Sequence, residues 1–319
     1  MTATFARPKV GVSACVMGQK VRYDGGHKRS HFVTDKLAEV VEFKSLCPEV
    51  GMGMPVPRPT IHVRELNGEY RLTDTRDGRL DHTDKMQSFF DRQRPVLDTL
   101  DGFVLAAKSP SCGMERIKVY NESGELMHRK GEGVFVHLLR QHYPHLPLEE
   151  DGRLNDAGLR EAFVTRVFAY RDFKQNVLAS KKMAELVNFQ SRYKLLLMAY
   201  SPAACRQLGR VVASASEHWQ SAIDQYLTLF MATLSKPTTR KKHTNALMHL
   251  QGYFKQQLSA QDKQALSEQI DKYRRGYVPL MAPMALLQHH LRHHPDDYVS
   301  KQVYLDPYPE QLGIRNLMQ

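Results

Sequence analysis

The sequence has few of the features that mark membrane, secreted or disulfide-rich proteins. Its 319 residues include 4 Cys and 1 Trp, and no apolar run approaches the roughly 20 residues of a bilayer-spanning helix. The opening segment, MTATFARPKV, lacks the apolar stretch of a secretory signal. Four widely spaced Cys in a chain of this length do not make a disulfide scaffold. We therefore expect a cytoplasmic protein with reduced thiols and no membrane partner.

What the chain does have is an average globular composition and an uneven distribution of charge. Hydrophobic residues make up 42% and charged residues 25%, which excludes global disorder. The net charge is +11, but residues 1–150 hold 22 basic and 20 acidic residues, and residues 151–319 hold 23 basic and 14 acidic ones. A net +9 on the second half indicates an anionic partner such as nucleic acid, or only a soluble basic domain.

The first half alternates between strand-like and helical patterns. Short apolar runs predict buried strands at residues 9–15, 41–47 and 102–107. Asn67-Gly68 predicts a type I′ hairpin turn. The longest helical segment, residues 81–100, contains Pro95, which should kink or split it. Strands that alternate with helices favour a parallel sheet, so residues 1–150 are predicted to form a Rossmann-like α/β domain.

The second half shows almost no strand signal. Apolar residues recur three and four positions apart over residues 160–178, 180–197, 219–234, 238–258 and 262–275. Ser201 followed by Pro202 is typical of a helix start, and Gly276 is typical of a helix end. Residues 151–319 are therefore predicted to form an all-α domain.

Three of the four Cys follow the predicted strands. Cys15 and Cys47 end the first two strands, and Cys112 comes shortly after the third. Ligands bind at the carboxyl edge of a parallel sheet, so we expect these three thiols to meet at one site. A single Cys at a strand end is more often a small buried residue, but three in the same position favour a shared site. Cys205, in the helical half, is interpreted as structural.

Counting thiolates leaves two kinds of metal site open. Catalytic zinc takes three protein ligands and keeps a fourth position open. Iron–sulfur clusters normally use four Cys, and a 4Fe–4S cluster with three would leave one iron open to a soft sulfur atom. A dinucleotide cofactor is not expected, because Gly51-Met-Gly53 lacks the rest of the dinucleotide-binding fingerprint.

Short motifs of the first half resemble the thiouracil desulfidase (TudS-like) family. They are VGVSAC at 10–15, VRYDGGH at 21–27, LCPEV at 46–50 with PVPRP at 55–59, and KSPSCG at 108–113. The resemblance implies that Cys15, Cys47 and Cys112 carry a 4Fe–4S cluster with one open iron. It also implies that this iron takes sulfur from a thiolated pyrimidine while water supplies the replacing oxygen.

The second half is similar to the YbgA-like domain that is often fused to this family. The similar stretches are residues 243–254, 273–280 and 304–309. The fusion resembles the RudS-like tRNA 4-thiouridine desulfidases, which implies hydrolytic conversion of 4-thiouridine in tRNA to uridine. Two alternatives stay open: a desulfidase of free 2-thiouracil or thionucleosides, and a non-catalytic metal-containing RNA-binding protein.

The resemblance also suggests catalytic residues near the cysteines. Glu49 is the candidate to position and deprotonate the water, although Pro48-Glu49 also suits the first turn of a helix. Ser109 is the first candidate to relay a proton, with Ser111 as the second. Hydroxyl groups in turns also often only satisfy backbone groups.

The remaining candidates are polar residues that would bind substrate or RNA. Asp24, Gly25 and Gly26 would grip the pyrimidine edge, unless they form a plain turn. Arg58 and Lys108 would neutralise cluster or phosphate charge, unless they are solvated surface residues. The candidate RNA-binding residues are Lys181, Lys182, Arg240, Lys241, Lys242, Arg274 and Arg275.

Overall fold

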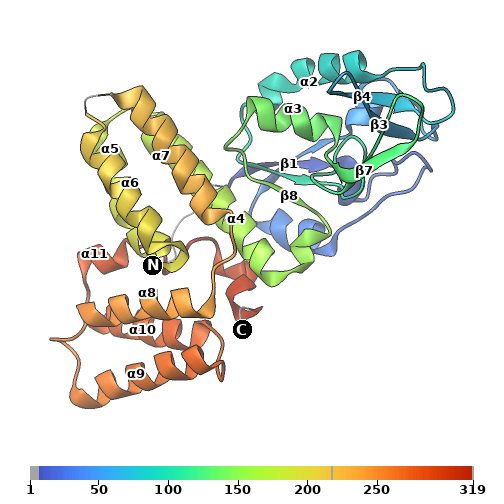
Figure 1. The fold of residues 1–319 in the computed structure, drawn as a ribbon. Coiled ribbons are helices and arrows are strands. Elements are labelled where there is room, and N and C mark those ends of the chain that lie inside the picture. Colours follow the sequence, from blue (N-terminus) through green and yellow to red (C-terminus); the bar gives the residue numbers. More distant parts are fainter. Residues whose placement is uncertain (1–6, 217, 318–319) are drawn as a thin grey trace. The chain divides into compact units, whose positions relative to one another are not determined.

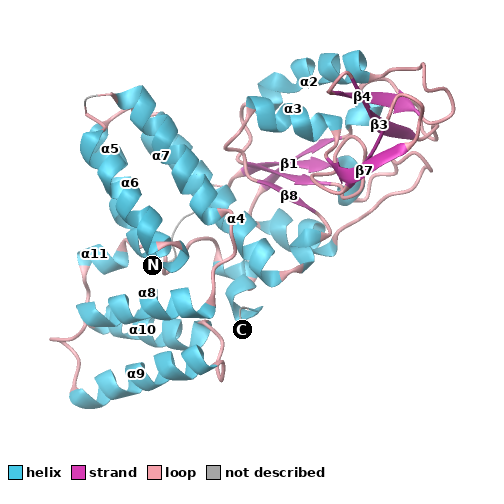
Figure 2. Cartoon of the chain, in the orientation of Figure 1, coloured by secondary structure: helices cyan, strands magenta, loops and turns pink. Residues whose placement is uncertain are grey.

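The computed structural model describes residues 7–216 and 218–317, which divide into an α/β unit ending at Asn155 and a helical unit that begins at Asp156. The strands of the described residues all lie in the α/β unit (Figure 2). The predicted fold class, an α/β domain followed by an all-α domain, is therefore confirmed. Along the described residues, no helix has both the length and the apolar character needed to cross a bilayer.

The centre of the α/β unit is a parallel sheet with the strand order β2-β1-β5-β8. Its strands are β1 (Lys9–Ser13), β2 (Glu42–Leu46), β5 (Gly102–Leu105) and β8 (Leu148–Glu150). Ser13 lies beside Leu46, and Leu105 lies beside Glu150, so the strands end at a common edge. The first three strands agree with the sequence prediction, whereas β8 was not predicted.

A second, mixed sheet has the strand order β4-β3-β6-β7. Its strands are β3 (Ile61–Leu66), β4 (Glu69–Asp74), β6 (Ile117–Tyr120) and β7 (Leu126–Gly131). The hairpin between β3 and β4 is confirmed: Asn67 and Gly68 have φ of 52° and 78°, which suits a type I′ turn. The sequence did not predict β6 and β7.

Two helices pack against the parallel sheet through aromatic side chains. They are α2 (Thr83–Leu97) and α3 (Val134–His142), seen together in Figure 1. The ring of Phe135 on α3 contacts Phe89 and Phe90 on α2 and Phe103 on β5, with centroids about 6 Å apart. Helix α2 is continuous through Pro95, so the expected split is wrong. The proline lies in the last turn, and the helix ends two residues after it.

The remaining elements of this unit are short. They are α1 (Pro48–Gly51), a π turn (Phe32–Lys36) and 3₁₀ turns (Ala14–Met17, Leu37–Glu39 and Arg153–Asn155). Two of them matter for the site: the turn over Ala14–Met17 contains Cys15, and Cys47 is the N-cap residue of α1. Both elements begin directly after strands of the parallel sheet.

The helical unit contains all the expected helices and two that the sequence did not predict. They are α4 (Ala157–Asp172, continued by a π turn over Phe173–Leu178), α5 (Met183–Tyr200), α6 (Pro202–Ser214), α7 (Trp219–Leu234), α8 (Arg240–Tyr253), α9 (Ala260–Arg275), α10 (Met281–His293) and α11 (Asp297–Ser300). Short 3₁₀ turns follow at Glu310–Leu312 and Ile314–Leu317. The unpredicted helices are α10 and α11.

Capping residues mark where helices of this unit begin and end, and aromatic side chains pack in its core. The Ser201 side chain accepts a hydrogen bond from the Ala204 backbone N–H, as expected for the start of α6. Gly276 ends α9 with φ of 84°, a conformation that glycine adopts without strain. In the core, the Phe189 ring of α5 packs edge-on against Phe173 and Phe230, with centroids 5.1 and 5.2 Å away.

Candidate functional site at the carboxyl edge of the parallel sheet

The three cysteines that follow strands lie together around one cavity. Cys15, Cys47 and Cys112 come after β1, β2 and β5, and all three line a cavity of about 390 Å³. Their convergence follows from the common carboxyl edge of neighbouring parallel strands. Cys205 is elsewhere, buried in the core of the helical unit. The structure thus brings together the three thiols that were predicted to share a ligand.

Burial controls the chemistry of these thiols. Burial, together with the neighbouring Cys47, raises the pKa of Cys15 to about 11. Burial also raises the pKa of Cys47, and it raises that of Cys112 well above the usual range for a thiol. Since a metal ligand must be a thiolate, a positively charged group at the site is needed to hold these side chains deprotonated.

Glu49 faces the same cavity and is held by a buried ion pair. Glu49 lies in the first turn of α1, so the helix-start position that the sequence also suggested is confirmed. Its Oε2 accepts hydrogen bonds from Nη2 and Nε of Arg58 at 2.7 and 2.9 Å. The Arg58 side chain is 2% exposed and also donates to the Val21 carbonyl at 2.9 Å. Arg58 is therefore engaged with Glu49, a partner that the sequence did not indicate.

The second oxygen of Glu49 faces the two candidate serines. The Ser111 hydroxyl donates to Oε1 at 3.0 Å, and the Ser109 hydroxyl lies 3.4 Å from the same atom. Ser109 lines the cavity, whereas Ser111 is fully buried and is not part of the lining. The Ser109 oxygen also accepts the backbone N–H of Cys112 at 3.1 Å. Ser109 is thus the hydroxyl placed to meet a substrate, and Ser111 supports Glu49.

The loop that was expected to grip the substrate is a hydrogen-bonded turn beside the cavity. Asp24 accepts the backbone N–H of Gly26 at 3.0 Å, and this bond lowers the pKa of the carboxyl. Gly25 has φ of 75°, which explains glycine at that position. Residues 24–26 are absent from the cavity lining within the described chain. Lys108, by contrast, lines the cavity and is exposed.

Two residues at this edge were missed by the sequence analysis. Asp151 directly follows β8, and it accepts a hydrogen bond from Nζ of Lys28 at 3.0 Å. Lys28 lines the cavity. Had Leu148–Glu150 been recognised as a fourth parallel strand, the strand-edge rule that led to the cysteines would also have indicated Asp151.

Two of the basic clusters in the helical unit come together. The Arg240 guanidinium, at the start of α8, packs against Gly276 at the end of α9, so the two helix ends are adjacent. We use the name α8–α9 surface for Arg240, Lys241, Lys242, Lys272, Arg274, Arg275 and Tyr277. Lys181 and Lys182 directly precede α5 and are not part of this surface.

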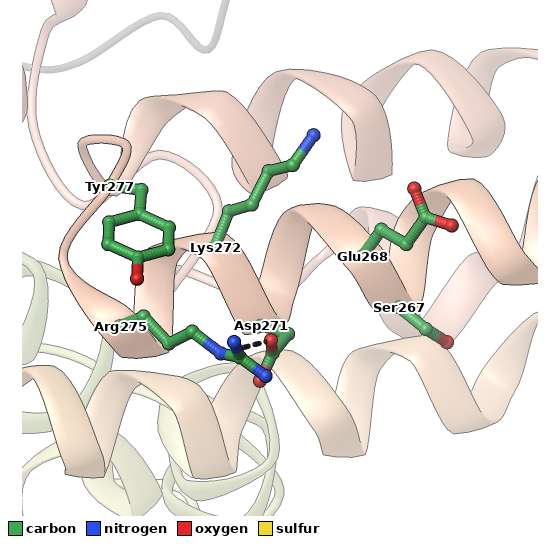
Figure 3. Close-up of a pocket in the computed structure, with 6 residues that line it drawn as sticks. All are labelled: Ser267, Glu268, Asp271, Lys272, Arg275 and Tyr277. Carbon is green, nitrogen blue, oxygen red and sulfur yellow. Dashed lines mark ion pairs between the residues drawn. The ribbon is translucent and has the colours of Figure 1, made fainter.

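The α9 side of this surface has a shallow hollow with an aromatic side chain beside basic ones. It is lined by Ser267, Glu268, Asp271, Lys272, Arg275 and Tyr277 (Figure 3). Asp271 pairs with Arg274 and with Arg275, each at 2.6 Å, which offsets part of the positive charge. Tyr277 is 74% exposed, an unusual degree for a tyrosine.

The α/β unit has the open parallel sheet of domains that bind ligands at the carboxyl ends of their strands. Its cavity at that edge is lined by three thiols. Residues 10–151 match the family model described as 2-thiouracil desulfurase. Residues 194–309 match the model described as a protein of unknown function (DUF1722). The uncharacterized protein YbgA of Escherichia coli (strain K12) is 34% identical over 159 residues, which cover 49% of this chain and 94% of that protein.

The chain therefore belongs to the YbgA family, and its α/β unit is a 2-thiouracil desulfurase domain. A solved structure, the [4Fe-4S]-dependent thiouracil desulfidase TudS, is 32% identical to this chain. The match covers 47% of this chain and 94% of TudS, with a TM-score of 0.37.

Proposed function

We propose that this protein is a tRNA 4-thiouridine desulfidase, which converts 4-thiouridine in tRNA to uridine with a 4Fe–4S cluster bound by Cys15, Cys47 and Cys112. The observation that carries the proposal is the meeting of these thiols with Glu49 and Ser109 around one cavity of a 2-thiouracil desulfurase domain. Water would add its oxygen to the ring carbon, the carbon–sulfur bond would break, and sulfur would leave as sulfide. No electron donor is required.

The donor set fits an iron–sulfur cluster. Three soft thiols surround the cavity, and thiolates are the usual cluster ligands. In the described part of the chain, no three His, Cys, Asp or Glu side chains are gathered closely enough for a single metal ion. When bound through three Cys, the cluster would supply an iron open to the sulfur of the substrate.

The side chains of this chain would then handle water and protons. The Arg58 guanidinium fixes Oε2 of Glu49, which leaves Oε1 directed at the serines and the cavity. From there the carboxylate orients the water and accepts its proton. The Ser109 hydroxyl, within 3.4 Å of Oε1, is placed to return a proton to the departing sulfur. The Arg58–Glu49 pair thus positions the base of the reaction.

The α8–α9 surface supports tRNA as the partner. Its basic side chains suit the phosphate backbone, and exposed Tyr277 offers a ring on which an unpaired base can stack. Because 4-thiouridine is part of a polymer, its base would have to leave the stack to reach the cavity. The family description favours a second candidate, desulfuration of free 2-thiouracil.

One anaerobic experiment separates these functions. The protein is reconstituted with iron and sulfide and incubated with tRNA that contains 4-thiouridine, and the near-ultraviolet absorbance of the thiolated base is followed. We expect this absorbance to be lost and sulfide to be released in equal amount. Consumption of 2-thiouracil with intact tRNA would favour the second candidate. Cluster and turnover should both be lost in Cys47→Ala, whereas Cys205→Ala serves as the matched control and should retain both.

A further inference from the structure

Lys28 lies on the wall of the cysteine cavity and is tied to the loop that carries Cys15. Its backbone N–H donates to the Cys15 carbonyl at 2.8 Å, so the two residues are held side by side although thirteen positions apart. Its side chain is 37% exposed and lines the cavity. The Lys28 side chain therefore borders the cavity that the three cysteines line.

Asp151 holds the Lys28 side chain in place through an ion pair. Its side chain is only 7% exposed, and Oδ1 accepts Nζ of Lys28 at 3.0 Å and the backbone N–H of Ala107 at 2.8 Å. The Asp151 backbone N–H also donates to the Leu105 carbonyl at 2.9 Å. One buried carboxylate thus joins the loop after β1 to the loop after β5. An exposed ion pair would not be fixed in this way, because long side chains on the surface keep their freedom.

The other cations of the cavity wall are engaged or loosely held. Arg58 is bonded to Glu49, Arg22 lies 3.8 Å from Asp24, and Lys108 is exposed. A lysine ammonium has three N–H donors. Asp151 is the acceptor that the described residues give to Lys28, which leaves two donors for the cavity. Lys28 is therefore a cation that combines a fixed position with unused hydrogen-bonding capacity.

We infer that Lys28 binds the substrate by donating to one of its oxygen atoms, and that Asp151 is the residue that positions Lys28. This inference rests on the proposed function only in that the substrate is a thiolated pyrimidine. Two oxygen sources share this chemistry, the remaining carbonyl of the pyrimidine ring and the phosphate of a nucleotide. Free 2-thiouracil has only the first, whereas 4-thiouridine 5′-phosphate and tRNA have both.

The test compares Lys28→Met and Lys28→Arg with Lys20→Met, a matched change at an exposed lysine of the same segment. Lys28→Met should raise KM about 10-fold, the effect of one charge-assisted hydrogen bond, with kcat changed little. Lys28→Arg should restore part of the affinity. Iron and sulfide content should match the wild type in all three variants. A KM effect on all substrates would assign the ring carbonyl, and an effect confined to phosphate-bearing substrates would assign the phosphate.

Asp151 is tested through its dependence on Lys28. Asp151→Asn should raise KM less than Lys28→Met does, and adding it to Lys28→Met should cause no further rise, because both changes remove one interaction. Effects that add in the double variant, or a loss of cluster in Lys28→Met, would mean that these residues only hold the loops, and would overturn the inference.

Failure of the proposed function is detected separately. Binding of 4-thiouridine 5′-phosphate is measured by equilibrium dialysis, which needs no turnover. If the wild type binds this nucleotide but does not desulfurate tRNA, the proposed function fails. The role of Lys28 is tested independently by comparing the Kd of this nucleotide for the wild type and for Lys28→Met. Equal affinities and equal KM values would refute it.

Discussion

At the scale of single residues, the site depends on pairings that a sequence does not display. Glu49 and Arg58 are nine positions apart and follow no periodic pattern, yet their buried ion pair fixes the candidate base. The sequence analysis preferred Ser109 to Ser111, and in the structure Ser109 lines the cavity whereas Ser111 is fully buried. Sequence patterns indicated which residue types lie near the thiols. The side-chain directions, which decide their roles, come from packing between distant segments.

Replacing Glu49 by Gln tests its role as the base. The amide preserves the shape and can still accept from Arg58, but it cannot take a proton from water. We expect kcat to fall by about 100-fold or more, within the usual range for loss of a general base, with iron content unchanged. Turnover assays beside iron analysis measure both. Glu39→Gln, at an exposed glutamate, is the control. Turnover within a few-fold of the wild type would remove Glu49 from the mechanism.

A buried histidine predicts how the helical unit responds to acid. His243 is 1% exposed, its Nδ1 lies 3.0 Å from the Tyr304 hydroxyl, and burial lowers its pKa to about 3, with the nearby Arg315 adding to the effect. The unfolded chain binds a proton at His243 below about pH 6.5, and the folded chain does not. Its contribution to stability is therefore complete above pH 6.5 and is lost as the pH falls toward 3.

Between pH 6.5 and 4.5 this loss should approach about 2 kcal/mol. Urea unfolding of the wild type and of His243→Phe at several pH values measures it: the variant should show a shallower decline. His249→Phe, at an exposed histidine, should decline like the wild type. Parallel curves for all three proteins would contradict the prediction.

At the scale of elements, length and periodicity decided what could be predicted. Strands β1 and β5 of the parallel sheet have short apolar runs, and most helices show a clear apolar stripe. Strand β8 has three residues, too few for a pattern, and two of them are glutamates. Strand β7 is mostly exposed, so it lacks the alternation that burial of one face would impose.

Helix α6 offers a local test of these start signals. The Ser201 hydroxyl oxygen accepts the Ala204 backbone N–H at 3.2 Å. Ser201→Ala should reduce the free energy of unfolding by about 1 kcal/mol, and Ser201→Asp should retain most of it, because aspartate caps equally well. Thermal and urea denaturation measure the difference. Equal destabilisation by both substitutions would show that the serine matters for another reason.

At the scale of the whole molecule, the excess positive charge lies mostly in the helical half. The helical half carries a net +9, and two of its three predicted basic clusters meet at the α8–α9 surface. The total charge can be summed from the sequence, but its placement cannot, because Arg240 and Gly276 become neighbours only when α8 and α9 pack. If this surface holds tRNA, the position of a charge should matter more than the total.

Two double variants with the same change in net charge test this prediction. Lys241→Gln/Lys242→Gln alters the α8–α9 surface, and Lys181→Gln/Lys182→Gln removes two charges outside it. The first should weaken tRNA binding and reduce the slope of log K against log salt by about 1 to 2, as phosphate contacts are lost. The second should change both values less. Filter binding across a salt series measures them. Equal effects would mean that only the overall field matters.

The spacing of the cavity residues along the chain also sets an order of events during synthesis. Cys15 and Cys47 leave the ribosome early, but Cys112 comes 65 residues after Cys47, and Asp151 comes 39 residues later still. Since β1, which directly precedes the turn that contains Cys15, lies between β2 and β5 in the sheet, a nascent fragment that lacks β5 and Cys112 cannot present the three thiols together. A cluster held by all three Cys could therefore be loaded only after Cys112 has been synthesised. Its insertion would then report that the α/β unit has folded.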